Sequence, residues 1–297
     1  MKKTYFVLAV VIIIIIGAYY YFQSSPTPVD NGGQTATTTD QTTDQTADLN
    51  KPEVVIGKSA GGRDIMAYNF GSGTTSLLFI GGIHGGYEWN TSLVAYKLMD
   101  YLKANPNVIP GNEKITIIPV LNPDGLIKVV GTSSRFTAAD VSADKEVVVS
   151  GRFNGNNVDL NRNFDCDWQT TGKWQDKTVS GGSASFSEPE SLALKNFVET
   201  IKPTAVVVWY SSAGGVFSSN CHDGILPETS VLTKTFSSAS GYRAFEEFNF
   251  YEITGDMVNW LAKINVPAIS VLLTNHTDTE WTKNQAGAEA ILKLYAK

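Results

Sequence analysis

His84 and Glu88 are the two side chains in this sequence whose types and spacing best suit metal chemistry. They lie four residues apart in the glycine-rich segment 81–90, directly after the apolar run 76–80. Imidazole and carboxylate groups are ligands that suit Zn²⁺. An uninterrupted apolar run indicates a strand buried on both faces, and open α/β sheets bind ligands at the carboxyl ends of such strands. A structural role beside a turn is the alternative for the same pair.

A second candidate group lies in the segment 151–164, which contains Arg152, Asn161 and Arg162. The segment belongs to a long region with few aliphatic residues, 131–185, and loops of this length inside a compact domain are usually functional. Because guanidinium groups pair bidentately with carboxylates, the two arginines could clamp an anion. A solvated loop is the alternative.

Apolar runs and helix-start signals predict the elements that would position these groups. Strands are expected at 54–56, 76–80, 115–121, 205–210 and 269–273, the last four of them buried, and the segment 122–125 predicts a turn. Periodicity and capping boxes predict helices that start near Glu88, Ser187, Thr254 and Thr277. Strands that alternate with helices indicate an α/β domain with a mixed, largely parallel sheet.

Two classes of function are disfavoured by the sequence. The segment 57–61 matches the Gly-x-Ser-x-Gly nucleophile elbow by its letters, but an elbow needs a helix immediately after the serine. Here a strand-like run at 64–70 follows instead. The formal net charge of −6 argues against a nucleic-acid partner, which would require a basic patch.

The amino-terminal fifty residues differ in composition from the rest of the 297-residue chain. Lys2 and Lys3 precede an uncharged apolar run, 5–22, which is nearly long enough to span a bilayer. We expect residues 1–22 to form an uncleaved membrane anchor, with a cleaved signal peptide as the alternative. Residues 23–50 are polar and predict a disordered linker. The domain, 51–297, is then expected on the extracytoplasmic side of the cell membrane, attached by a single pass.

From residue 54 to its end, the chain resembles the zinc carboxypeptidases, the carboxypeptidase A-like metallopeptidases. The segment 57–65 is similar to the family's entry motif, and His84 and Glu88 are similar to its first two zinc ligands. Residues 122–125, followed by Arg152, Asn161 and Arg162, resemble the substrate-binding segment. Residues 251–256, followed by Trp260, resemble the segment that carries a mobile tyrosine. The resemblance implies a three-layer α/β/α sandwich and a zinc cofactor.

The resemblance also implies roles for individual residues. Arg152 would steady the oxyanion that develops on the scissile carbonyl, and Asn161 and Arg162 would hold the terminal carboxylate of a peptide. Tyr251 would close over the bound peptide. Val258 lies where the family's pocket-floor residue falls, which suggests that an apolar substrate side chain is selected. As the alternative, Asp256 could receive a basic group such as diaminopimelate.

Three departures from the family pattern bear on activity. The first two ligands are spaced His-x-x-x-Glu, one residue more than usual. Tyr210 stands where the third zinc ligand should be a histidine, and it could bind zinc only as a metal-stabilised phenolate. Leu272 stands where the catalytic glutamate is expected. His276 is a possible replacement ligand or base, although a polar role beside the next helix is the alternative.

Two functions therefore stay open. One is a metallocarboxypeptidase-like hydrolase acting on the C-terminal residues of peptides or cell-wall peptides. The other is a degenerate member that binds peptide or peptidoglycan fragments without cleaving them. In an oxidising compartment, Cys166 and Cys221 are expected to form a disulfide near the rim of the site.

Overall fold

The computed structural model describes residues 48–297. The predicted anchor, 1–22, and most of the predicted linker lie outside the described residues, and both stay predictions. Within residues 48–297, no helix has the length and apolar character needed to cross a membrane. The end of the predicted linker contacts the domain, because Asn69 Nδ2 and Lys114 Nζ donate hydrogen bonds of 3.0 and 2.8 Å to the carbonyl of Leu49.

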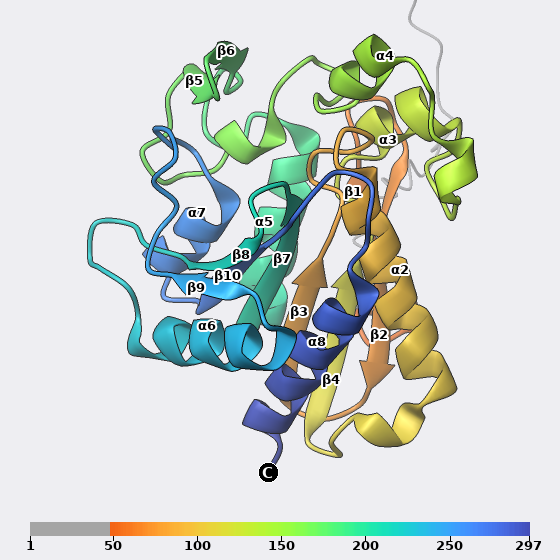
Figure 1. Ribbon diagram of the computed structural model, residues 1–297, viewed down its shortest axis with the longest axis vertical. Coiled ribbons are helices and arrows are strands. Elements are labelled where there is room, and N and C mark those ends of the chain that lie inside the picture. The colour runs from red at the N-terminus through yellow and green to blue at the C-terminus, as the bar shows by residue number, and fades with distance from the viewer. Residues whose placement is uncertain (1–47) are drawn as a thin grey trace, which may run out of the picture. The chain divides into compact units, whose positions relative to one another are not determined.

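Eight strands form one mixed sheet in the order β1-β2-β4-β3-β7-β10-β8-β9 (Figure 1). The four central strands β4, β3, β7 and β10 are parallel to one another, and the pairs β1/β2, β2/β4 and β10/β8 are antiparallel. The strand bounds are β1 (Glu53–Lys58), β2 (Asp64–Gly71), β3 (Thr75–Ile80), β4 (Glu113–Ile118), β7 (Ala205–Ser211), β8 (Gly215–Ser218), β9 (Arg243–Phe245) and β10 (Ala268–Leu273). A separate two-stranded hairpin contains β5 (Thr171–Trp174) and β6 (Lys177–Ser180).

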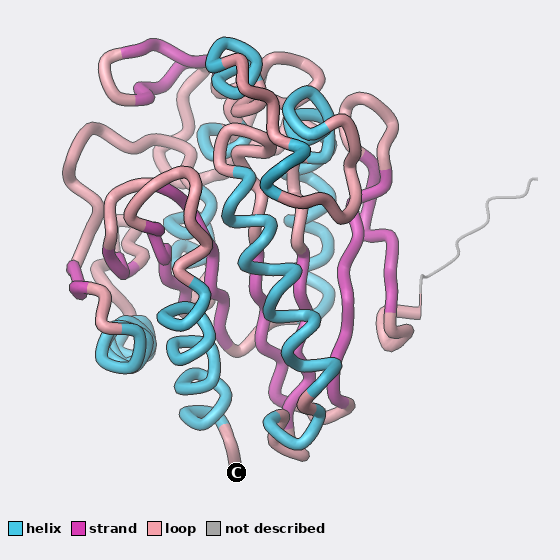
Figure 2. The backbone as a smooth tube through the Cα atoms, turned by 45° about the vertical axis from the view of Figure 1, so that its right-hand side comes forward, coloured by secondary structure: helices cyan, strands magenta, loops and turns pink. Residues whose placement is uncertain are grey.

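Helices cover both faces of the sheet, as Figures 1 and 2 show. Their bounds are α2 (Trp89–Ala104), α3 (Pro123–Val130), α4 (Lys145–Ser150), α5 (Pro189–Ile201), α6 (Pro227–Ser240), α7 (Met257–Lys263) and α8 (Trp281–Tyr295). The structure thus confirms the predicted α/β sandwich around a mixed, largely parallel sheet.

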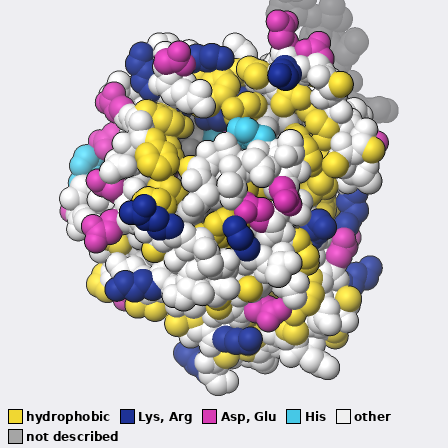
Figure 3. All heavy atoms as spheres, viewed as in Figure 1, with side chains coloured by type: hydrophobic (Ala, Val, Ile, Leu, Met, Phe, Trp, Pro, Cys, Tyr) yellow, Lys and Arg dark blue, Asp and Glu magenta, His cyan; other side chains and the backbone are white. Residues whose placement is uncertain are grey.

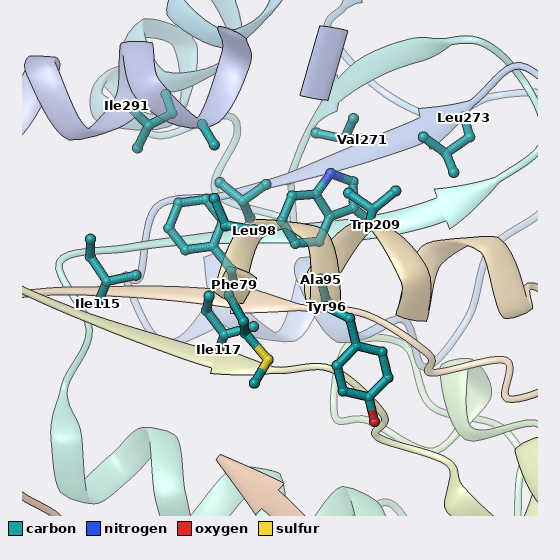
Figure 4. Packing of buried hydrophobic residues seen from close by; sticks show 14 of the residues in the cluster. Phe79, Ala95, Tyr96, Leu98, Ile115, Ile117, Trp209, Val271, Leu273 and Ile291 are labelled. Carbon is teal, nitrogen blue, oxygen red and sulfur yellow. The ribbon is translucent and has the colours of Figure 1, made fainter. Parts of the chain in front are cut away.

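Two hydrophobic clusters lie on opposite faces of the sheet, because successive side chains of a strand alternate between faces. On one face, α2, α6 and α8 pack on residues such as Phe79, Trp209 and Val271, and the rings of Phe79 and Trp209 stack with centroids 5.7 Å apart (Figure 4). On the other face, α5 and α7 pack on the alternate residues of the same strands, which include Tyr210 and Leu272. The strands predicted from apolar runs are confirmed at all five positions, within a few residues.

The starts of several helices differ from the sequence prediction. Segment 122–125 is not an isolated turn but the start of α3, with Asn122 as the cap that accepts a hydrogen bond from Gly125 N. The α7 helix starts at Met257 rather than Thr254, capped by Asp256. Neither predicted capping box forms, because Glu190 accepts hydrogen bonds from Ala60 N and Asn154 Nδ2, and Glu280 accepts from Thr274.

Two further predictions are tested by the fold. Ser59 lies in the connection between two antiparallel strands, not in a turn between a strand and a helix, and donates a hydrogen bond of 2.7 Å to Asp124 Oδ1. Segment 57–61 is therefore not a nucleophile elbow. Cys166 and Cys221 form the predicted disulfide, with their Cα atoms 6.2 Å apart.

Candidate functional site

A cavity of about 920 Å³ opens at the carboxyl ends of β3, β7 and β10. Parallel strands deliver the residues that follow them to the same edge of the sheet. The structure therefore brings together residues that are far apart in the sequence. The predicted site residues that line the cavity are His84, Glu88, Arg152, Asn161, Tyr210, Tyr251, Asp256, Val258 and His276, together with Leu272.

His84 and Glu88 form a buried pair at the base of the cavity. Nδ1 of His84 lies 2.9 Å from Oε1 of Glu88, and Nε2 lies 3.4 Å from Oδ1 of Asp159. Neither ring nitrogen is aligned for a hydrogen bond with its neighbour. The second carboxylate oxygen of Glu88 accepts a hydrogen bond of 3.0 Å from Ser211 N. The side chains can therefore present one nitrogen and one oxygen donor to the same point.

The extra residue between His84 and Glu88 is absorbed by a turn that precedes α2, which begins at Trp89. Gly85 has φ +46° in this turn, and a Cβ atom there would lie 2.6 Å from the carbonyl oxygen of Gly151. Such a contact, together with the positive φ, requires glycine. The turn thus keeps both side chains at the edge of the sheet despite the added residue.

Arg152 is held beside this pair by a carboxylate that the sequence analysis missed. Its Nε and one terminal nitrogen each lie 2.9 Å from Oδ2 of Asp159, and the other terminal nitrogen lies 3.8 Å from Glu88. The Trp174 ring covers the guanidinium, with the ring centroid 4.5 Å from Cζ of Arg152. Burial alone would raise the pKa of Asp159, but Arg152 and His84 hold that pKa well below its usual range. The position of Asp159, two residues before the predicted site residue Asn161, is the sequence feature that could have identified it as part of the site.

Tyr210 and Leu272 are directly paired in the register of β7 and β10, and both side chains face the cavity. The Tyr210 hydroxyl donates a hydrogen bond of 3.3 Å to Oδ1 of Asn161, and its ring centroid lies 5.8 Å from that of His84. Burial and the charges of Asp256 and Glu88 raise the pKa of Tyr210 well above its usual range. The phenol is therefore neutral at physiological pH unless a metal ion stabilises its phenolate.

Asn161 and Asp256 form the polar side of the cavity. Asn161 Nδ2 donates a hydrogen bond of 2.8 Å to Asp256, and Asn161 Oδ1 accepts one of 3.1 Å from Met257 N. Burial raises the pKa of Asp256, although its hydrogen bonds partly oppose this effect. Val258, on the first turn of α7, adds an apolar surface to the same cavity.

Arg162 is the one predicted site residue that does not line the cavity. Its guanidinium donates hydrogen bonds to the carbonyls of Asn161 and Lys173, and Tyr251 lies over it with the ring centroid 5.9 Å away. Binding of a terminal carboxylate by Arg162 stays a prediction, and it would require the side chain to exchange at least one of these partners.

Comparisons with known proteins identify the family of this chain. A family model described as zinc carboxypeptidase matches residues 38–286. This chain belongs to the zinc carboxypeptidase family. Among relatives, it is 25% identical over 220 residues to gamma-D-glutamyl-L-diamino acid endopeptidase 1 of Lysinibacillus sphaericus, which covers 66% of this chain and 54% of that protein. Human carboxypeptidase Z is 34% identical over 122 residues, 37% of this chain and 17% of that protein. The chain thus spans about half or less of these relatives.

Solved structures of the same fold include the murein-tripeptide amidase MpaA of Escherichia coli O157, with a TM-score of 0.58 and 20% identity. That comparison covers 83% of this chain and 94% of the amidase. Bovine thrombin-activatable fibrinolysis inhibitor has a TM-score of 0.62 and 18% identity, over 82% of this chain and 87% of that one. These likenesses confirm the zinc carboxypeptidase fold.

Membership of the zinc carboxypeptidase family implies a zinc ion, and the donor set of this chain does not fit a three-ligand zinc site. His84 and Glu88 supply two donors, while the third expected position holds a neutral phenol that is directed at Asn161. In residues 48–297, the one cluster of three His, Cys, Asp or Glu ligand atoms is Cys166, Cys221 and His222. Its two cysteines are joined as a disulfide, so it offers no thiolate.

His276 lies on the rim, where the sequence analysis proposed a replacement ligand or base. Its Nδ1 lies 3.0 Å from the Ser211 hydroxyl and its Nε2 3.4 Å from the Ser212 hydroxyl. Its ring packs on that of Tyr87, and the two ring centroids lie 4.6 Å apart. Burial lowers its pKa from the usual value. None of these contacts joins the ring to His84 or Glu88, and the role of His276 as a replacement ligand or base stays a prediction.

Charges are mixed on the surface around these elements. Figure 3 shows acidic and basic side chains interspersed over one face of the molecule, without a continuous basic area. The expectation of no nucleic-acid partner stays a prediction.

Proposed function

We propose that this protein binds the carboxyl-terminal part of peptides in the cavity without zinc-dependent hydrolysis. The observation that carries the proposal is the pairing of Tyr210 with Leu272 at the cavity wall. A leucine side chain cannot accept a proton, and a neutral phenol is a poor zinc ligand. The chain therefore lacks both the third donor and the base that the family mechanism requires.

Recognition groups are present even though this chemistry is lost. Arg152 offers a positive charge and Asn161 an amide at the cavity wall, and Asp256 offers a carboxylate. Tyr251 and Trp174 add aromatic surface. A cavity that combines apolar walls with a few fixed polar groups is typical of a ligand-binding site.

We further infer that the ligand is a cell-wall peptide. The endopeptidase and the amidase named above act, by their names, on diamino acid and murein peptides, and this supports the same class of ligand here. Asp256 could receive the side-chain ammonium of a diamino acid. A location outside the cell membrane, with residues 1–22 as the anchor, would place the cavity beside such peptides.

A hydrolase acting on C-terminal residues is the second candidate function. The retained His84–Glu88 pair favours it, because a weakly held zinc would still be bound by two good donors.

The test measures binding and turnover on the full-length chain with a tripeptide that ends in meso-diaminopimelate. Isothermal titration should show saturable binding, and mass spectrometry should show that added zinc does not increase cleavage of the peptide. Tyr251→Phe should weaken binding about fivefold if its hydroxyl contacts the ligand. The matched change Tyr101→Phe, on the remote helix α2, should have no effect. Absence of binding, or zinc-dependent cleavage, would refute the proposal.

A further inference from the structure

Four polar side chains form a continuous hydrogen-bonded chain, and three of them, Ser211, His276 and Ser212, line the cavity. In order they are Asn90, Ser211, His276 and Ser212. Asn90 Oδ1 lies 3.1 Å from Ser211 Oγ, Ser211 Oγ lies 3.0 Å from His276 Nδ1, and His276 Nε2 lies 3.4 Å from Ser212 Oγ. The proposed peptide-binding function uses none of these contacts.

The direction of each hydrogen bond follows from Asn90. Its Nδ2 donates to two carbonyl oxygens, those of Asn275 at 2.8 Å and Asp278 at 2.9 Å. These two acceptors orient the amide, so Oδ1 faces Ser211 and can only accept. The Ser211 hydroxyl therefore donates to Asn90.

The same reasoning assigns the tautomer of His276. Because the Ser211 proton is directed at Asn90, its oxygen accepts from His276, and Nδ1 must carry the hydrogen. The lone pair of the neutral imidazole is then on Nε2, which faces Ser212. A histidine oriented by one neighbour, with its free nitrogen toward a hydroxyl, has the arrangement of a general base beside a nucleophile.

Exposure separates the two serines. Ser211 is buried with its hydroxyl and backbone N–H both engaged, the latter with Glu88. Ser212 is exposed and lines the cavity, so its hydroxyl can reach a ligand bound there. Its distance of 3.4 Å from Nε2 is long for a hydrogen bond, as is common before a substrate is bound.

The surroundings of His276 suit a base at neutral pH. The ring is partly buried against Tyr87, and burial lowers its pKa, which keeps the imidazole neutral. The Arg152 guanidinium lines the same cavity and would supply the positive charge that a developing oxyanion needs.

The geometry points to a metal-independent acyl-transfer site, with Ser212 as nucleophile and His276 as general base. Ser212 Oγ would attack the carbonyl carbon of an amide or ester as His276 Nε2 takes the hydroxyl proton. The C–N or C–O bond of the substrate then breaks, and the proton passes from Nε2 to the leaving amine or alcohol. Water repeats the sequence on the acyl-serine and releases the acid. Asn90 and Ser211 are positioning residues.

This inference goes beyond the proposed function, which requires only binding. It also differs from the second candidate function, because no step depends on zinc, His84 or Glu88.

The test treats the full-length chain with a fluorescent fluorophosphonate in the presence of a zinc chelator. This reagent phosphonylates activated serines with release of fluoride. We expect one adduct, mapped by mass spectrometry to the peptide that contains Ser212. Ser212→Ala should abolish labelling, and His276→Asn should slow it at least about 100-fold. The control Ser134→Ala changes an exposed serine outside the cavity lining and should label like the parent.

Thermal melting verifies that each variant is folded, and His276→Gln gives the same test if His276→Asn is not. Absence of an adduct at Ser212, or labelling of both His276 variants at the parental rate, would overturn the inference. Peptide binding is measured on the same preparations. Binding without an adduct would leave the proposed function intact, whereas an adduct without peptide binding would leave only the serine–histidine pair.

Discussion

At the scale of single residues, the activity of the zinc carboxypeptidase site depends on what stands at positions 210 and 272. These residues are register partners on β7 and β10, so a donor at each position would face the cavity beside His84 and Glu88. A phenol and an aliphatic group fit the fold at these positions, because both side chains join the apolar cluster under α5 and α7.

Restoring both donors should restore metal binding. We expect Tyr210→His with Leu272→Glu to raise zinc affinity at least about tenfold and to produce carboxypeptidase activity. Leu272→Glu alone should help less, because a base needs a firmly held metal-bound water. Calorimetry with zinc and a peptidase assay measure the two effects.

The double variant also predicts a change in stability. An added buried carboxylate without a metal is costly, so this variant should melt at a higher temperature with zinc than without. A double variant that shows no response to metal would contradict the assignment of these two positions.

Glu113 does not line the cavity, and its burial predicts a dependence of stability on pH. It is fully buried at the start of β4, and neither carboxylate oxygen has a hydrogen-bond partner. Burial raises its pKa to about 7 from the ordinary 4.5. Between these two pH values the unfolded chain releases the proton and the folded chain keeps it. The free energy of unfolding therefore falls as pH rises through this window.

We expect Glu113→Gln to remove this pH-dependent loss. The variant should be more stable than the parent at pH 8, by up to about 3 kcal/mol, and similar to it at pH 4. Urea unfolding at both pH values measures the difference. Glu53→Gln, at an exposed carboxylate, is the control. An equal effect of Glu113→Gln at pH 4 and pH 8 would contradict the explanation.

At the scale of elements, the sequence predicted what depends on local pattern and missed what depends on distant partners. The apolar runs of β3, β7 and β10 identified central strands because such strands are buried on both faces. The predicted capping boxes do not form. Glu190 accepts a hydrogen bond from Ala60, which is distant in the chain, and Glu280 accepts one from Thr274, which precedes the helix. Those contacts exist only after folding, so a pattern of neighbouring residues could not reveal them.

The Cys166–Cys221 disulfide links two loops of the domain, and its loss should destabilise it. The sequence separation is 55 residues, for which the chain-entropy model gives about 4 kcal/mol. We expect Cys166→Ser with Cys221→Ser to lower the melting temperature clearly, as measured by circular dichroism. Adding a reductant should lower the parent's melting temperature to that of the variant and leave the variant unchanged. A parent that is insensitive to reductant would count against this estimate.

At the scale of the whole molecule, the predicted anchor and linker determine which compartment the cavity meets. Externally added protease on intact cells should release a soluble fragment by cutting between residues 23 and 50. The control is the same treatment of lysed cells. Protection of the domain in intact cells, with cleavage after lysis, would reverse the predicted orientation.

Much of the site could be predicted from the order of motifs along the chain, because His84, Glu88, Arg152 and Asn161 do meet at one cavity. What could not be predicted is orientation. Arg162 lies outside the cavity lining because its guanidinium donates hydrogen bonds to the backbone carbonyls of Asn161 and Lys173. The Asn90–Ser211–His276–Ser212 chain joins three distant segments and has no sequence signature.

The most direct test of the account is the zinc content of the full-length protein after equilibration with a competing chelator of micromolar affinity. With two donors and a neutral phenol, the protein should retain far less than one zinc ion per chain. Elemental analysis by mass spectrometry gives the ratio, and His84→Ala identifies the site of any zinc that remains. One zinc ion per chain that is retained by the parent and lost in His84→Ala would contradict the account.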